Sequence, residues 1–148
     1  MYGRIKGALA VAALVLTAAA CGDRSVTAPA APVAGRNPVV FPMTFNVTQS
    51  FSAGQAFTAT GGPGVVDFTG TLQTPTPCFD VTATNVQSHA IVVTVTATDL
   101  GGICTQVVTW NDYNGQLTGV PAGAHAFKVV HVVGGHSTTM WNGTVTVL

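Results

Sequence analysis

The chain has 148 residues, of which 47% are hydrophobic and only 7% charged. This length and apolar content suit one domain with a packed core and exclude disorder over most of the chain. Lys128 is the only Lys or Arg after residue 40, so the basic cluster that a nucleic-acid partner requires is missing.

The first twenty residues have the order of a secretory signal peptide. Arg4 and Lys6 precede an apolar run over residues 8–16, and small residues follow at 18–20. The run is shorter than the roughly 20 apolar residues that a membrane-spanning helix needs. We therefore expect residues 1–20 to be removed during export.

Cys21 follows these small residues directly. The sequence Ala18-Ala19-Ala20-Cys21 resembles the lipobox of bacterial lipoproteins, although that family usually has Leu where Ala18 stands. The resemblance covers residues 1–21 and implies that Cys21 becomes the lipidated first residue of a protein of the bacterial cell envelope. Gly22, in place of Asp, resembles lipoproteins that are sorted to an outer membrane where the cell has one. The alternative is ordinary secretion, with a free Cys21.

Residues 21–38 form the lipidated cysteine and a flexible tether. Alanine and proline alternate over residues 27–35 without an apolar period, which is typical of a partly extended linker. After cleavage, three basic residues and five aspartates remain, which gives a net charge of −2. The folded domain is expected over residues 39–148.

From residue 39 onward, apolar side chains recur with a period of two, and no stretch has helical spacing. Pro42 interrupts the first run and predicts an edge position for it. The dipeptide Asn114-Gly115 predicts a turn. The stretches with strand-like character span residues 39–47, 57–60, 66–72, 79–83, 91–98, 104–110, 116–118, 124–133 and 138–148, of which 57–60 and 116–118 are brief.

Seven to eight short strands with frequent turns predict an all-β fold, a single antiparallel immunoglobulin-like β-sandwich. A closed barrel is the alternative. In the strand over residues 124–133, we expect Phe127, Val129, His131 and Val133 to share one face. Trp110, which shares its parity with Cys104, is expected in the core near the cysteines.

Cys78 and Cys104 are expected to form a disulfide, because export favours oxidised pairs. The enclosed loop of 26 positions would contribute about 3.5 kcal/mol by the chain-entropy estimate. In a three-stranded meander the outer strands lie about 9.6 Å apart, whereas a disulfide needs Cα atoms within about 7 Å. Either Cys78 lies off the ladder near Pro77, or the two strands face each other from different sheets.

The segment over residues 117–127 resembles the strand entry of copper–zinc superoxide dismutases, which are also β-sandwiches. The matching positions are Gly119, Val120, Pro121, Gly123, His125 and Phe127. In that family, metal-binding histidines follow the Phe directly and two places later, where this chain has Lys128 and Val130, so a copper site of that kind cannot form. The same Pro-x-Gly entry is common in immunoglobulin-like domains, and we adopt that interpretation.

Few side chains are candidates for a site. His131 and His136 lie across the Gly134-Gly135 turn and are the one histidine pair that could hold a metal, because His125 is about 20 Å from His131 along one strand. Tyr113 and Trp141 lie near predicted turns and are the candidates for ligand contact. The absence of Glu disfavours a glycosidase-type carboxylate pair, and no nucleophile elbow is present.

The sequence therefore predicts a non-enzymatic envelope lipoprotein without a cofactor. Its β-sandwich would be a binding or scaffolding module, held on a membrane by its lipid, whose partner is an envelope protein or a glycan. That partner would meet the loop tips or the edge strand near Pro42. The alternative is a metal-handling or redox envelope protein that uses His131 and His136.

Overall fold

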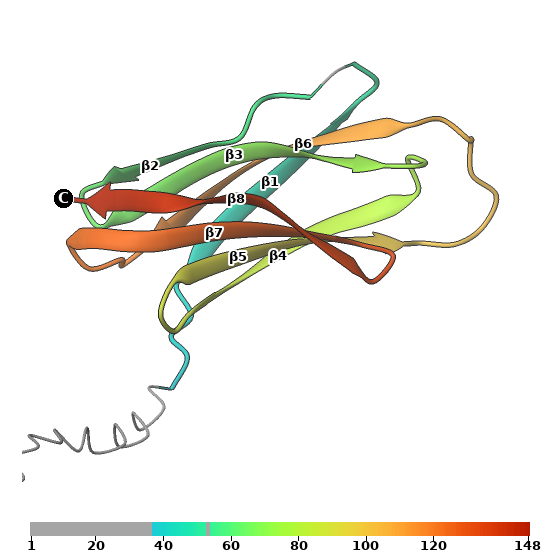
Figure 1. Ribbon diagram of the computed structural model, residues 1–148. Coiled ribbons are helices and arrows are strands. Elements are labelled where there is room, and N and C mark those ends of the chain that lie inside the picture. Colours follow the sequence, from blue (N-terminus) through green and yellow to red (C-terminus); the bar gives the residue numbers. More distant parts are fainter. Residues whose placement is uncertain (1–36, 53) are drawn as a thin grey trace, which may run out of the picture. The chain divides into compact units, whose positions relative to one another are not determined.

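The computed structural model describes residues 37–52 and 54–148. The predicted signal peptide, Cys21 and nearly all of the predicted tether lie outside these residues. The described part of the chain contains eight strands and no helix (Figure 1). The strands are β1 (Met43–Ser50), β2 (Thr58–Gly62), β3 (Val65–Thr74), β4 (Phe79–Gln87), β5 (Ile91–Asp99), β6 (Thr109–Thr118), β7 (Gly123–Val133) and β8 (His136–Val147).

The strands form two sheets of four, in the orders β1-β6-β3-β2 and β4-β5-β7-β8. The predicted all-β sandwich is therefore confirmed. All neighbouring strands are antiparallel except β5 and β7, which run parallel with Ile91 beside Phe127. The parallel pair arises because the intervening strand β6 belongs to the other sheet, so the chain crosses over before it returns beside β5.

Alternate side chains of both sheets fill one interior, as the period of two predicts. Val93 and Val95 on β5 are fully buried, while Thr94 and Thr96, which alternate with them, lie on the outer side. On β7, Phe127, Val129 and His131 are buried on one face and Val133 is half-buried against the core, which confirms that prediction. The buried apolar residues are Phe41, Val66, Phe68, Leu72, Ile91, Val93, Val95, Ala97, Tyr113, Leu117, Val120, Phe127, Val129, Val145 and Val147.

Two aromatic rings in this core lie over glycines of the neighbouring strand. In the β3–β6 register, Gly70 is opposite Tyr113 and Gly115 is opposite Phe68. A Cβ atom on Gly70 would collide with the Tyr113 hydroxyl, and one on Gly115 would collide with the Phe68 ring. The rings of Phe68 and Tyr113 pack with their centroids 6.3 Å apart. Small and large side chains are thus matched across the two central strands.

The predicted turn at Asn114-Gly115 is wrong, because both residues lie inside β6. This strand is continuous and pairs with β1 on one side and β3 on the other. Tyr113, Gly115 and Leu117 keep the same inward parity through the dipeptide. Pairing on both sides and burial of this face outweigh the local turn preference.

The predicted strand over residues 104–110 is also wrong, because β6 begins only at Thr109. Trp110 lies on the outer face of β6 and is not part of the core, whereas Thr109 is fully buried. The prediction placed Trp110 in the core because it has the same strand parity as Cys104. That parity does not apply, since Cys104 lies in a loop and not on the ladder.

The first predicted strand begins later than expected, at Met43. Val39 forms only an isolated bridge to Gln87 at the end of β4. The buried amide of Asn85 then holds the backbone of Phe41: the Phe41 N–H donates to Asn85 Oδ1 over 2.8 Å, and Asn85 Nδ2 donates to the Phe41 carbonyl over 2.9 Å. After Pro42 the chain enters the other sheet, where β1 is an edge strand, which confirms the edge position.

Candidate functional site

Tyr113 does not lie near a turn, and it is not available to a ligand at the surface. It stands in the middle of the central strand β6 with 1% of its surface exposed. Its hydroxyl lies 2.8 Å from Nε2 of His131 on β7, so this hydrogen bond joins the two sheets across the core. Burial raises the pKa of the Tyr113 hydroxyl above its usual range, so the hydroxyl stays protonated at neutral pH.

His131 is buried with 7% of its surface exposed. Burial lowers the pKa of its imidazole to about 4, so the ring is neutral at physiological pH. The Tyr113 ring packs edge-on against it, with centroids 5.6 Å apart. We conclude that His131 is a satisfied polar residue of the core.

The predicted pair of His131 and His136 does not converge on one site. His131 points inward and has Nε2 occupied by the Tyr113 hydroxyl, whereas His136 is exposed and pairs with Val133 at the hairpin end. Among the described residues, no group of three or more His, Cys, Asp or Glu is placed to hold a metal ion. His125 bonds instead to its own loop, through Nε2–H to the Pro121 carbonyl over 2.7 Å.

Trp141 on β8 is half-buried and packs on the core. Its ring lies 5.4 Å from that of Phe57 and 5.8 Å from that of Phe127, measured between centroids. A Cβ atom on Gly143 would lie 2.7 Å from the Trp141 ring, so this ring too covers a glycine. Trp141 and Tyr113 therefore do not form a common contact patch.

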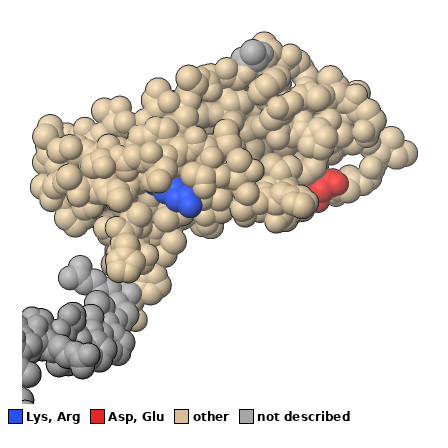
Figure 2. All heavy atoms as spheres, in the orientation of Figure 1, with Lys and Arg blue, Asp and Glu red and all other residues tan. Residues whose placement is uncertain are grey.

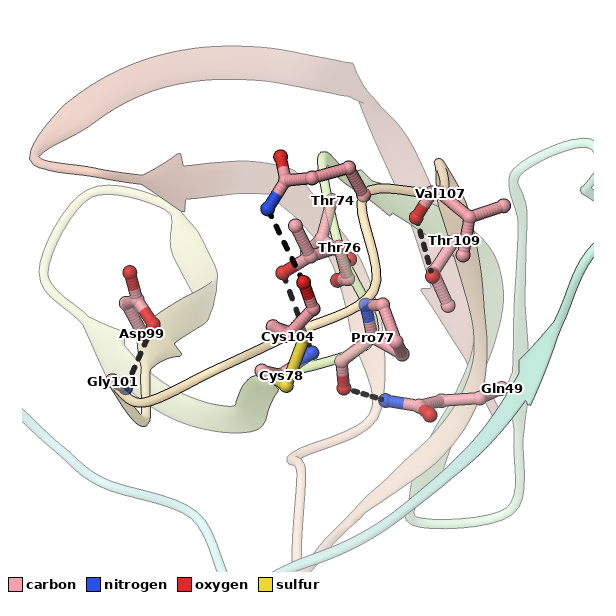
Figure 3. Close-up of a disulfide and its surroundings, with 11 residues drawn as sticks. Gln49, Thr74, Thr76, Pro77, Cys78, Asp99, Gly101, Cys104, Val107 and Thr109 are labelled. Atoms are coloured by element: carbon pink, nitrogen blue, oxygen red, sulfur yellow. Dashed lines mark hydrogen bonds between the residues drawn. A yellow bond between two sulfur atoms is a disulfide. The ribbon is translucent and has the colours of Figure 1, made fainter.

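Cys78 and Cys104 form the predicted disulfide, with Cα atoms 6.1 Å apart (Figure 3). Cys78 lies immediately before β4, and its carbonyl accepts a hydrogen bond from the Leu100 N–H over 3.0 Å. Cys104 lies in the loop over residues 100–108. The first of the two expected arrangements is confirmed, because Cys78 lies off the ladder beside Pro77.

The disulfide ties down a loop with exposed apolar side chains. Ile103 is fully exposed and Leu100 is 69% exposed, and Val107 and Val108 are also on the surface. The loop lies at the end of the sandwich where β1, β3 and β5 end and where β7 turns into β8 (Figure 1). Charged groups are sparse on the face that Figure 2 shows, and the acidic atoms on it lie near this end. This end therefore presents exposed aliphatic side chains beside the carboxylate of Asp99, which accepts a hydrogen bond from the Gly101 N–H over 2.8 Å.

The chain enters the sandwich at the opposite end. Val39 pairs with Gln87, the last residue of β4, and the Thr118 N–H at the end of β6 donates to the Pro42 carbonyl over 3.0 Å. The entry segment and the loop over residues 100–108 are thus separated by the length of the strands.

A buried polar cluster, which the sequence analysis missed, supports the disulfide end. Thr74 and Thr109 donate hydroxyl hydrogens to the loop carbonyls of Thr76 and Val107, over 2.8 and 3.2 Å (Figure 3). Asn111 Nδ2 donates to the Leu72 carbonyl and to Thr74 Oγ1, while Asn111 Oδ1 has no partner in the described part of the chain. The available signal was inward parity, which Thr74 shares with Leu72 and Thr109 shares with Tyr113.

No protein family, curated protein or solved structure matches this chain. The immunoglobulin-like relationship therefore stays a prediction, while the sandwich itself rests on the strands. In the described residues, no helix has the length and apolar character needed to cross a membrane.

Proposed function

We propose that this protein is a non-enzymatic lipoprotein of the bacterial cell envelope whose β-sandwich is a binding module. The leader and the lipobox-like sequence ending at Cys21 support a lipid anchor. The Ala/Pro composition of residues 21–38 supports a tether that keeps the domain clear of the bilayer.

The single observation that carries the binding role is the placement of two features at opposite ends of the sandwich. The chain enters beside Gln87, whereas the disulfide holds an exposed apolar loop around Ile103 at the other end. A domain tethered at the first end would present the second to partners beyond the membrane. Exposed aliphatic side chains around Ile103 fit a protein surface, so we propose an envelope protein as the partner.

The anchor is tested by changing Cys21→Ser in the full chain. We expect the variant to lose all incorporation of labelled fatty acid and to move from the membrane fraction to the soluble fraction, because the thiol that carries the lipid is gone. The matched control is Cys78→Ser with Cys104→Ser, which removes the other cysteines and should leave labelling unchanged. Labelling of Cys21→Ser would contradict the lipid anchor.

The binding surface is tested in intact cells with a photo-crosslinking amino acid at position 103. The control position is Thr82, which is exposed on the outer face of β4. We expect a discrete protein adduct from position 103 and none from position 82. The absence of an adduct at position 103, a glycan adduct there, or the same products from both positions would each contradict the proposal.

A further inference from the structure

The first half of β8 leaves the core. Residues 136–140 are exposed on both faces, whereas burial alternates again toward Val145 and Val147. The change coincides with a bulge, since Val129 pairs with Trp141 but Val130 pairs with Thr139. Bulges increase local twist, and Figure 1 shows the β7–β8 hairpin twisting at this end of the sandwich.

The outer edge of this half of the strand has no backbone partner among the described residues. β8 is the last strand of its sheet. β2 covers only its C-terminal end, where the Leu148 N–H donates to the Gly62 carbonyl over 3.1 Å and the Gly64 N–H donates to the Leu148 carbonyl over 3.3 Å. Residues 136–144 therefore present a row of free N–H and C=O groups, which is a template for another strand.

The other long edges are protected in ways that β8 is not. On β4, Val39 pairs with Gln87, the Asn85 amide holds Phe41, and Asp80 adds a charge. On β1, Pro42 precedes the first residue of the strand. Proline, charge and a covering segment are the usual devices that prevent edge pairing.

In the part of the chain that the structure describes, the edge of β8 has no proline, charge or covering segment over its first half, and its one irregularity is the bulge between Thr139 and Trp141. Residues 129–148 include no Lys, Arg, Asp, Glu or Pro. Its exposed first half instead has Ser137, Thr138, Thr139 and Met140, residues that a strand accommodates well.

We propose that β8 pairs antiparallel with β8 of a second copy of this chain, so that two four-stranded sheets become one continuous sheet. An antiparallel edge is self-complementary about a two-fold axis, which is the commonest symmetry of soluble homo-oligomers. The distribution of charged residues favours a second copy of this chain as the partner strand. Asp80 on β4 and Asp99 on β5 are the two acidic residues of this sheet and lie toward its opposite edge, so pairing through β8 keeps these residues of the two copies far apart.

Sedimentation velocity over a wide concentration range tests the proposal. The material is residues 34–148, a compact unit that contains all eight strands, the core and the disulfide. We expect a reversible dimer. Neighbouring residues of a strand point to opposite faces, so Thr138→Lys and Thr139→Lys place a charge on each face of the edge. We expect at least one of them to raise the dissociation constant by about tenfold or more, because like charges on paired strands repel.

Thr82→Lys is the matched control, since it adds the same charge on the exposed face of β4 and should leave the dimer intact. Both edge positions are exposed, so circular dichroism should show an unchanged fold in all three variants. A monomer at every concentration would overturn the proposal. A dimer that neither edge variant weakens would overturn it as well, because the copies would then meet through another surface.

Discussion

Mild acid should destabilise this domain through one residue, His131. In the folded state burial lowers the pKa of this imidazole to about 4, whereas the ordinary pKa of histidine is 6.5. Below pH 6.5 the unfolded chain therefore binds a proton that the native core does not accept. The contribution of the neutral His131 ring to the free energy of unfolding is complete above pH 6.5 and falls as the pH drops toward 4. Below pH 4 the titration of His131 causes no further loss.

The magnitude follows from the two pKa values. The free energy of unfolding should fall by up to about 1.4 kcal/mol per pH unit within this window, which amounts to about 2.5 kcal/mol at pH 4.5. Loss of several kcal/mol is a large share of the stability of a small domain. Tyr113, whose hydroxyl bonds to the ring, stays neutral across this range because burial raises its pKa.

Urea denaturation of residues 34–148 at several values between pH 7.5 and 4.5 measures the effect. The reference is His131→Leu, which removes the titrating ring and retains the aspartates and the three other histidines. At pH 7.5 we expect the variant to be less stable, because the Tyr113 hydroxyl loses its partner. The deficit should shrink by about 2.5 kcal/mol at pH 4.5. An equal deficit at both pH values would refute the burial argument.

Two further predictions concern packing and the disulfide. Gly115→Ala should lower the free energy of unfolding by about 1–3 kcal/mol, because the new methyl group meets the Phe68 ring. Phe68→Leu in the same chain should relieve part of this cost. If the effects of the two substitutions were strictly additive in the double variant, that result would contradict the contact. Cys78→Ser with Cys104→Ser should lower the free energy of unfolding by about 3.5 kcal/mol with little change in far-ultraviolet circular dichroism, since the bond restricts mainly the unfolded chain. Thiols that react in residues 34–148 without reductant or denaturant would contradict the bond itself.

The period of two was sufficient to predict the fold class and most inward faces. Val93 and Val95, or Phe127 and Val129, alternate with outward residues so regularly that a half-buried strand is the one solution that hides the apolar set. The disulfide could also be predicted, because the expected export favours oxidised pairs and two cysteines remain after Cys21. Strand spacing left two arrangements open, and the structure has the one in which Cys78 lies off the ladder.

The sequence alone also pointed to His131, but as a candidate metal ligand and not as a residue of the core. His131 was conspicuous because it lies close to His136 across a turn. The burial of its ring and its bond to Tyr113 depend on β6 and β7 facing each other from different sheets, which residues 18 positions apart do not reveal.

Only the tertiary structure shows where long-range strand pairing outweighs a local sequence preference. Asn114-Gly115 would turn in an isolated chain, yet pairing with strands on both sides and the Phe68 ring over Gly115 keep the dipeptide extended. The parallel pairing of β5 with β7 and the unpaired edge of β8 likewise depend on which strands become neighbours. Alternation specifies which face of a strand is buried, whereas the neighbour of each strand is set by long-range packing that no short stretch encodes.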